Sequence, residues 1–388
     1  MKDLAAELER RRQQALYRTR RIAEGPQGPV MRIDGREILS FCSNDYLGLA
    51  SHPEVIRSFK AAADAYGVGA GAAHLINGHT RAHHALEEEL AAFTGRERAL
   101  LFSTGYMANL GVVSSLLGRG DAVFEDRLNH ASLIDAGLLS GARFQRYTHA
   151  DPEALEKKIS SSESNEKLIL SDGVFSMDGD IAPLPDLAHI AAQHQAWLMV
   201  DDAHGIGVLG DNGAGSLEHF GLSSSEVPIL MGTLGKALGT AGAFVAGSAD
   251  LIEYLIQTAR TYIYTTAMPA AIAEATRTSL KLVQAETWCR KELSALIQHF
   301  RKGAENLGLE LMPSKTPIQP LIVGDSETAL RISQSLFEHG ILVSAIRPPT
   351  VPEGTARLRF TFSVSHTIEQ IDFLLATLEE VLEQHTTP

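Results

Sequence analysis

Short apolar runs alternate with amphipathic stretches through the middle of the chain. The runs predict strands at 99–102, 121–125, 143–147, 167–172, 196–201, 229–232 and 242–246. Helical spacing of the apolar residues predicts helices at 53–66 and 82–93 and in the segments that separate the strands. Such alternation predicts an α/β fold, in which a mostly parallel seven-stranded sheet is covered by helices on both faces.

The two ends of the chain have a different pattern. An amphipathic helix is expected over most of 3–22, followed by a hairpin that turns at Asp34-Gly35. Beyond residue 268 a long helical stretch precedes a segment with strands at 318–323, 341–345 and 357–362 and helices at 289–307, 326–339 and 367–383. We therefore expect a helix and hairpin at 1–44 that pack with a smaller α+β domain at 288–388, and a large domain at 45–287.

Composition excludes several classes of partner. The net charge of −13 does not suggest binding to nucleic acid, which is itself negatively charged. The hydrophobic content of 44% is ordinary for a globular enzyme. Polar residues and glycines interrupt the apolar run at 99–118, so no membrane span is expected. The charged start lacks a secretory signal and the only two cysteines, Cys42 and Cys289, make no disulfide pattern, which favours a cytoplasmic location.

Lys236 is the most informative residue. It lies in the glycine-rich stretch 232–239, downstream of a predicted strand that ends at Asp201. A lone lysine is most often a solvated surface charge. A lysine amine can also form a Schiff base with an aldehyde cofactor, and a carboxylate such as that of Asp201 can keep a pyridine nitrogen protonated. Together the two residues point to a pyridoxal-phosphate site.

Two other motifs compete with this interpretation. Residues 205–210 read G-x-G-x-x-G after a strand, as in a dinucleotide-binding turn, but 211–215 is a poor helix start and Asp201 and Asp202 would repel a pyrophosphate. His79 and His83 stand four apart and could share a helix face as zinc ligands do, but no nearby acid or cysteine is expected to complete the set. No metal is therefore expected.

A phosphate site is expected at the strand-to-helix turn 103–109, where Gly105 lets an anion approach the N–H groups that open a helix. His130, Ser176 and His204 follow other predicted strands. In a doubly wound sheet these carboxyl ends line one crevice, so the polar residues should gather there.

Nearly the whole chain resembles the α-oxoamine synthases, which are fold-type I pyridoxal-phosphate enzymes. The matching runs are 41–49, 129–132, 173–179, 200–205 and 233–236, in that order. The resemblance implies that Lys236 forms the Schiff base, that Asp201 partners the pyridinium nitrogen and that His130 stacks on the cofactor. Further cofactor contacts are implied for Gly105, Tyr106, Ser176, His204 and Thr233, and for Thr266, which resembles a residue that reaches the phosphate of a second subunit. A homodimer is thus expected.

The substrates are implied in the same way. Residues 346–352 and 354–359 most resemble the family members that join L-alanine to a pimeloyl thioester, of coenzyme A or of acyl carrier protein, in biotin synthesis. Asn44 and Arg359 would bind the amino-acid carboxylate, and Arg18 and Thr350 the acyl substrate. His130 is implied to contact the substrate as well as the cofactor. Asp172 and the loop 70–78 depart from the usual pattern and could alter selectivity. Two alternatives stay open: a family member that uses glycine, of the aminoketobutyrate ligase type, and a non-catalytic cofactor-binding protein.

Overall fold

The computed structural model describes residues 2–386, and these form two compact units. The larger unit comprises Leu49–Ser176 and Ile181–Arg290, and the smaller one comprises the chain up to Gly48, Met177–Asp180 and the chain from Lys291 onward. The domain boundaries expected from the sequence stay a prediction, since a domain is defined by its capacity to fold alone.

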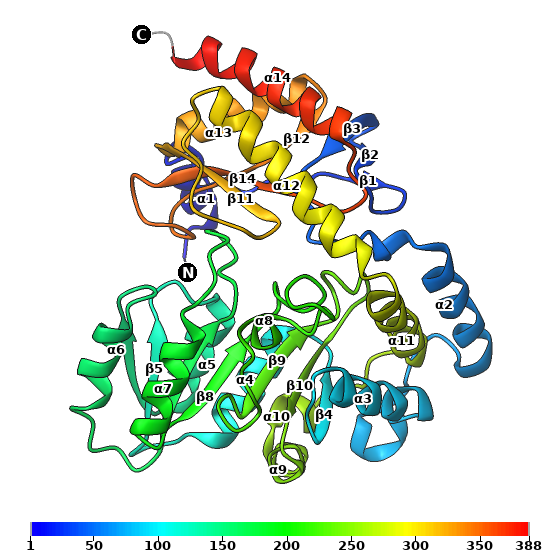
Figure 1. Cartoon of the computed structure of the whole chain (residues 1–388), viewed down its shortest axis with the longest axis vertical. Helices are drawn as coiled ribbons and strands as arrows, with labels where there is room; N and C mark the ends of the chain where they lie inside the picture. The colour runs from blue at the N-terminus through cyan, green and yellow to red at the C-terminus, as the bar shows by residue number, and fades with distance from the viewer. Residues whose placement is uncertain (1, 387–388) are drawn as a thin grey trace. The chain divides into compact units, whose positions relative to one another are not determined.

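The larger unit is built around one seven-stranded sheet (Figure 1). In spatial order its strands are β4 (Arg98–Phe102), β10 (Ala243–Gly247), β9 (Ile229–Thr233), β8 (Trp197–Asp201), β7 (Lys167–Asp172), β5 (Ala122–Asp126) and β6 (Arg143–Tyr147). Only β10 runs antiparallel to its neighbours. The mostly parallel sheet expected from the sequence is confirmed.

Helices cover both faces of this sheet. The helices of the larger unit are η1 (Leu49–Ser51), α2 (Pro53–Tyr66), η2 (His74–Gly78), α3 (Arg81–Phe93), α4 (Gly105–Leu116), α5 (Ala131–Ser140), α6 (Pro152–Ile159), α7 (Leu184–Gln193), α8 (Ser216–Phe220), α9 (Ala249–Thr258), α10 (Arg260–Ile263) and α11 (Ala270–Ala285). Along β7, Leu168 and Leu170 belong to the core under α4, α5, α9 and α10, whereas Ile169 belongs to the core under α6, α7 and α8. The central strands are therefore apolar at nearly every position, because each face of the sheet is buried.

The smaller unit has two sheets. The first has the order β1 (Ala23–Glu24), β2 (Val30–Ile33), β3 (Arg36–Ser40) and β12 (Ile341–Leu342), and the second has the order β11 (Ile318–Gly324), β14 (Ala356–Thr361) and β13 (Ser344–Ile346). The remaining helices are α1 (Leu4–Gln13), α12 (Trp288–Asn306), α13 (Ser326–Glu338) and α14 (Ile368–Thr386). Phe362 packs edge-on against Phe41 and within 4.8 Å of Phe300, between ring centroids, in the core of this unit.

The first helix is shorter than expected. The pattern predicted a helix over most of 3–22, but α1 ends at Gln13, because Ala15 adopts the left-handed conformation (φ 54°). The N–H of Leu16 then reaches back to the carbonyl of Arg11, and Arg347 binds the free carbonyl of Ala15. A tertiary contact thus stops a helix that local propensity would continue. Arg18 consequently lies outside the helix.

The strand expected at 341–345 is in fact two strands. Ile341 and Leu342 pair in parallel with β3, whereas Ser344 to Ile346 pair antiparallel with β14. Val343 is buried at the point where the chain leaves one sheet for the other. An apolar run alone does not reveal such a change of partner.

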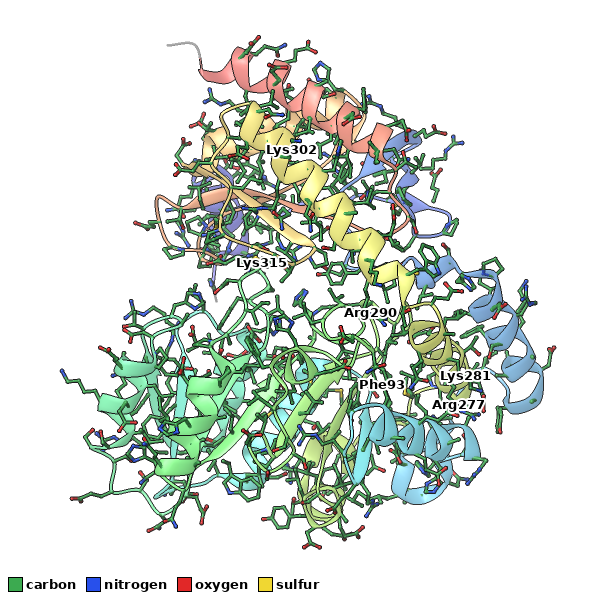
Figure 2. All side chains as sticks on the ribbon, in the orientation of Figure 1. Phe93, Arg277, Lys281, Arg290, Lys302 and Lys315 are labelled. Carbon is green, nitrogen blue, oxygen red and sulfur yellow. The ribbon has the colours of Figure 1, made fainter. Side chains whose placement is uncertain are left out.

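Salt bridges attach α11 to α3 in the larger unit. Arg277, which projects from α11 (Figure 2), donates to Glu89 of α3 (Nη2 to Oε1, 2.6 Å) and to Glu274 one turn earlier.

Among the described residues, no helix is long and apolar enough to cross a membrane.

Candidate active site

The carboxyl edge of the large sheet gathers most of the polar residues singled out in the sequence. Asp172, Asp201 and Thr233 are the last residues of β7, β8 and β9, three neighbouring strands of the sheet. The other residues follow strand ends on short loops: Gly105 and Tyr106 after β4, His130 after β5, Ser176 after β7, His204 after β8 and Lys236 after β9. Because these strands run in one direction, all of these residues lie at one edge of the sheet.

Asp201 is a carboxylate buried at the end of a central strand. Only 4% of the residue is exposed. Its Oδ2 accepts a hydrogen bond from Asn109 Nδ2 (2.8 Å), and its Oδ1 accepts one from the N–H of Ala203 (3.1 Å). A buried carboxylate needs such donors, since burial without them is costly. The donors fix the position of the carboxylate.

The same network extends from Asp201 to His130. Asn109 Nδ2 also donates to Ser132 Oγ at 2.8 Å, and Ser132 Oγ lies 2.7 Å from His130 Nδ1. The backbone N–H of His130 donates to Asp172 Oδ2 at 2.9 Å. The side chain of His130 itself is exposed. One fully buried amide therefore holds Asp201 and, through a hydroxyl group, the exposed imidazole of His130.

Two acids meet at the ends of β7 and β8, where Asp172 and Asp201 are register partners. Burial, and then the charge of Asp201, raise the pKa of Asp172 well above its ordinary value. Burial also raises the pKa of the adjacent Asp202 to about 7. Like charges this close cannot all be ionised. The protonated form of Asp172 is thus favoured beside the carboxylate of Asp201.

Lys236 lies next to His204 on the loop that follows β9. Its Nζ is 3.0 Å from His204 Nε2. Lys236 is half-buried and His204 is buried, so the amine is partly withdrawn from water but still accessible. A lysine in such a position can react with an aldehyde.

An anion can bind at the start of α4. Thr104 caps this helix by accepting the N–H of Met107 with its Oγ1 and that of Ala108 with its carbonyl. Within residues 2–386, the backbone N–H groups of Gly105 and Tyr106 donate no hydrogen bond. They can therefore bind an anion. The phenol of Tyr106 donates a hydrogen bond to Asp135.

These donors and acceptors fit pyridoxal phosphate, the cofactor expected from the sequence. The phosphate matches the start of α4, the pyridine nitrogen matches the carboxylate of Asp201, and the aldehyde matches Lys236. Thr233 ends β9, and its hydroxyl donates to the carbonyl of Gly242 at 3.1 Å. The amide oxygen of Asn109 is buried and has no hydrogen-bond partner among the described residues, so one acceptor of the network is unsatisfied.

The G-x-G-x-x-G stretch does not form a dinucleotide site. Residues 203–213 are turns and bends, and the next helix, α8, begins only at Ser216. Asp202 lies beside Gly205 and Glu218 lies beside Gly210 instead, and Asp202 Oδ2 accepts the N–H of Ser216 at 2.7 Å. Without a helix N-terminus this stretch offers a pyrophosphate nothing to bind.

Four of the predicted substrate residues lie in the smaller unit, in two pairs, whereas His130 lies in the larger unit. Arg359 Nη2 is 3.4 Å from Asn44 Oδ1, which also accepts the hydroxyl of Tyr46. Burial raises the pKa of Tyr46 to about 12. Arg18 and Thr350 line one pocket of about 340 Å³ together with Arg11 and Arg347. Burial and the charge of Arg18 lower the pKa of Arg347.

Thr266 stands apart from the other cofactor residues. It is exposed on the segment after α10 and pairs through its backbone with Ala73 in an isolated bridge. The N–H of Ala267 donates to the carbonyl of Ala72 at 3.0 Å. Among the described residues, no contact joins Thr266 to Lys236 or Asp201, and its expected role in a second subunit stays a prediction.

The histidine cluster differs from its expected geometry. His79 does not share a helix with His83, because α3 begins at Arg81. His83 is fully buried, and its Nε2 is 2.7 Å from the carbonyl of Met268. The sequence suggested no nearby acid, but Glu87 Oε2 lies 3.8 Å from His79 Nε2. Burial raises the pKa of Glu87 to about 7.

Asn109 and Ser132 were not predicted as site residues. A polar amide in the middle of α4, a helix of mostly small and apolar residues, is the signal that could have revealed Asn109. Ser132 lies two residues after the predicted His130. Its other partner, Asn109, is 23 residues away in the sequence, so only the three-dimensional structure reveals this contact.

Comparisons with known proteins agree with this geometry. Residues 36–378 match the family model "Aminotransferase class I and II". The chain belongs to this family. It is 67% identical over 380 residues to the 8-amino-7-oxononanoate synthase of Thioalkalivibrio sulfidiphilus, covering 98% of this chain and 97% of that one. For the synthase of the same name from Nitrosococcus oceani, the identity is 62% over 97% of this chain and all of the relative.

Solved structures in this family have the same fold. The serine palmitoyltransferase of Sphingomonas wittichii superposes with a TM-score of 0.93 at 31% identity, covering 99% of both chains. The 8-amino-7-oxononanoate synthase of Francisella tularensis gives 0.78 at 35% identity, covering 90% of this chain and 99% of that one. The fold class and the resemblance to the α-oxoamine synthases are confirmed.

Asn109→Leu should lower turnover while leaving the fold intact. Leucine fills a similar volume but donates to neither Asp201 nor Ser132, so both Asp201 and His130 lose their alignment. Misplacing catalytic groups by about 1 Å costs up to ~100-fold, and we expect kcat to fall by about ten- to a hundredfold. Steady-state kinetics would measure this, with Ser114→Ala on the same helix as a matched control. Wild-type kcat in Asn109→Leu would show that the network does not position the site.

Proposed function

We propose that the chain is an 8-amino-7-oxononanoate synthase. It joins L-alanine to a pimeloyl thioester, releasing carbon dioxide and the free thiol, in biotin synthesis. The observation that carries this proposal is the 67% identity over 98% of the chain to a relative of that name. The edge of the large sheet supplies the matching chemical groups. The enzyme would act in the cytoplasm.

Pyridoxal phosphate, when bound, supplies the electron sink that stabilises negative charge at the α-carbon of the amino acid. Asp201 would hold a proton on the ring nitrogen, because its buried carboxylate favours the positive charge there. The N–H groups of Gly105 and Tyr106 would bind the phosphate. Ser176, His204 and Thr233 would complete the contacts at the same edge, and His130 would contact the ring.

Lys236 has two roles in this proposal. Its Nζ would hold the cofactor through the aldehyde group, and it would also accept the α-proton of L-alanine. The neighbouring His204 Nε2, at 3.0 Å, can share a proton with that amine. The imidazole of His204 could therefore take up a proton from the amine of Lys236, which would let that amine act as a general base.

Asn44 and Arg359 would bind the carboxylate of L-alanine. A guanidinium presents two parallel N–H donors that match a carboxylate. Arg359 is 94% buried and 3.4 Å from the Asn44 amide oxygen, so its position is set before substrate arrives. The pocket around Arg18 and Thr350 would take the acyl substrate, since Arg11, Arg18 and Arg347 concentrate positive charge where pimelate and its carriers are anionic.

One assay tests this function. Purified protein with pyridoxal phosphate, L-alanine and pimeloyl thioester should form 8-amino-7-oxononanoate, detected by mass spectrometry, and Lys236→Ala should form none.

Arg18→Gln should raise the KM for the thioester and not that for L-alanine, with Arg10→Gln on α1 as the control. A preference for glycine would favour the aminoketobutyrate ligase alternative, and turnover by Lys236→Ala would contradict the mechanism.

We also propose a homodimer in which Thr266 serves the cofactor phosphate of the partner. Thr266 is exposed and joined to no cofactor residue of its own chain in the contacts described. A two-fold interface would place each Thr266 at the other site.

A hybrid of one Lys236→Ala subunit and one Thr266→Ala subunit tests this arrangement. If Thr266 acts in the partner's site, one site carries both lesions and the other carries none, so activity should be about half that of wild type. The Thr266→Ala homodimer is the control. A hybrid with no more than the residual activity of Thr266→Ala would show that each site is built from a single chain.

A further inference from the structure

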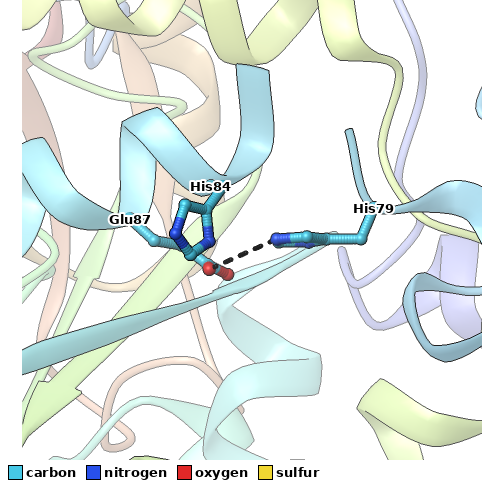
Figure 3. Close-up of side chains that lie close together, drawn as sticks. All are labelled: His79, His84 and Glu87. Atoms are coloured by element: carbon cyan, nitrogen blue, oxygen red, sulfur yellow. Dashed lines mark ion pairs between the residues drawn. The ribbon is translucent and has the colours of Figure 1, made fainter. Parts of the chain in front are cut away.

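A cluster of two histidines and one acid, none of them assigned to the cofactor or the substrate, lies in the larger unit. His79 stands at the end of η2, and His84 and Glu87 project from the first turns of α3 (Figure 3). One ring nitrogen of each histidine and one carboxylate oxygen of Glu87 lie within 4.8 Å of one another.

We propose that His79, His84 and Glu87 bind a divalent transition-metal ion of the Zn²⁺ class. This inference goes beyond the proposed function and does not depend on it. Two imidazole nitrogens and a carboxylate oxygen are a ligand set that zinc accepts, with water in the remaining position.

The separation of the ligand atoms supports this assignment. Zinc holds such ligands at about 2.0 to 2.2 Å, so two of them in a tetrahedral site lie about 3.4 Å apart. His79 Nε2 and Glu87 Oε2 are 3.8 Å apart and face each other (Figure 3), so they need to move only slightly. His84 follows the spacing His-x-x-Glu on α3, which places it on the same helix face as Glu87.

Neighbouring groups already orient two of the three ligands. Glu87 Oε1 accepts the N–H of Leu101 at 3.0 Å, which leaves Oε2 for an ion. His79 Nδ1 lies 3.0 Å from His74 Nδ1, and when His79 donates this hydrogen bond its Nε2 carries the lone pair that faces Glu87. Histidines that bind metals commonly donate their other ring N–H in this way.

The third ligand, His84, is free to adjust. Half of its side chain is exposed (52%), and its Nε2 is 3.5 Å from Glu88 at i, i+4 spacing. An exposed ion pair of this kind contributes little, so rotating His84 toward the ion costs little. The open side of the site lets an ion enter from solvent.

Bound metal would also stiffen the turn that begins with η2. Ala72 and Ala73 at its start pair with Ala267 and Thr266, and His83 of α3 holds the carbonyl of Met268. An ion that joins His79 to α3 would therefore slow amide hydrogen exchange at Gly78 and Ala267.

Equilibrium dialysis of the full-length holoenzyme against ZnCl₂, with metal analysis, tests the site. We expect one Zn²⁺ per chain, no competition from Mg²⁺, which prefers oxygen ligands, and binding at least about tenfold weaker in His84→Ala and in Glu87→Gln. Glu88→Gln and His189→Ala remove a neighbouring acid and another exposed histidine and should bind like wild type.

Two results would overturn the proposal. One is wild-type protein that binds no Zn²⁺, and the other is Zn²⁺ binding that His84→Ala and Glu87→Gln leave unchanged. Glutamine keeps an oxygen that can accept the N–H of Leu101, so Glu87→Gln should fold. The readout is metal content, so the result is independent of whether the enzyme makes the proposed product.

Discussion

Burial of the Asp201 carboxylate is the constraint on which the site depends. A carboxylate with 4% exposure is costly unless it is paired, and the protein supplies donors from Asn109 and the N–H of Ala203. These donors fix where the negative charge lies. The remaining compensation is a cation, which the protonated ring of pyridoxal phosphate would supply. The buried carboxylate of Asp201 is thus placed where it would favour a proton on the ring nitrogen of the cofactor.

The topology of the sheet makes this arrangement possible. Parallel strands end at one edge, so residues from β7, β8 and β9 meet there although they are far apart in the sequence. Asp172 beside Asp201 would double the charge, but burial raises the pKa of Asp172 and favours its neutral form. The selectivity effects expected for Asp172 stay a prediction.

The sequence predicted the large sheet well, because its strands are uniformly apolar and separated by helices of ordinary length. Lys236 and Asp201 were also recognisable, since a lysine among glycines and an acid after an apolar strand are local signals. The end of α1 at Gln13 was not predictable, because Arg347 from the far end of the chain binds the carbonyl of Ala15. The short distance between Glu87 and His79 likewise depends on the turn formed by η2, and no simple sequence pattern predicts that turn. The roles of the individual site residues remain proposals, supported by their placement.

The protonation state of the cofactor's ring nitrogen tests the central claim most directly. Nitrogen-15 NMR of the protein loaded with ring-labelled pyridoxal phosphate reports it as a chemical shift. The account predicts a protonated ring nitrogen in wild type and loss of that proton in Asp201→Asn, with cofactor still bound through Lys236. An unprotonated ring nitrogen in wild type, or the same protonated signal in Asp201→Asn, would contradict the role of the buried carboxylate.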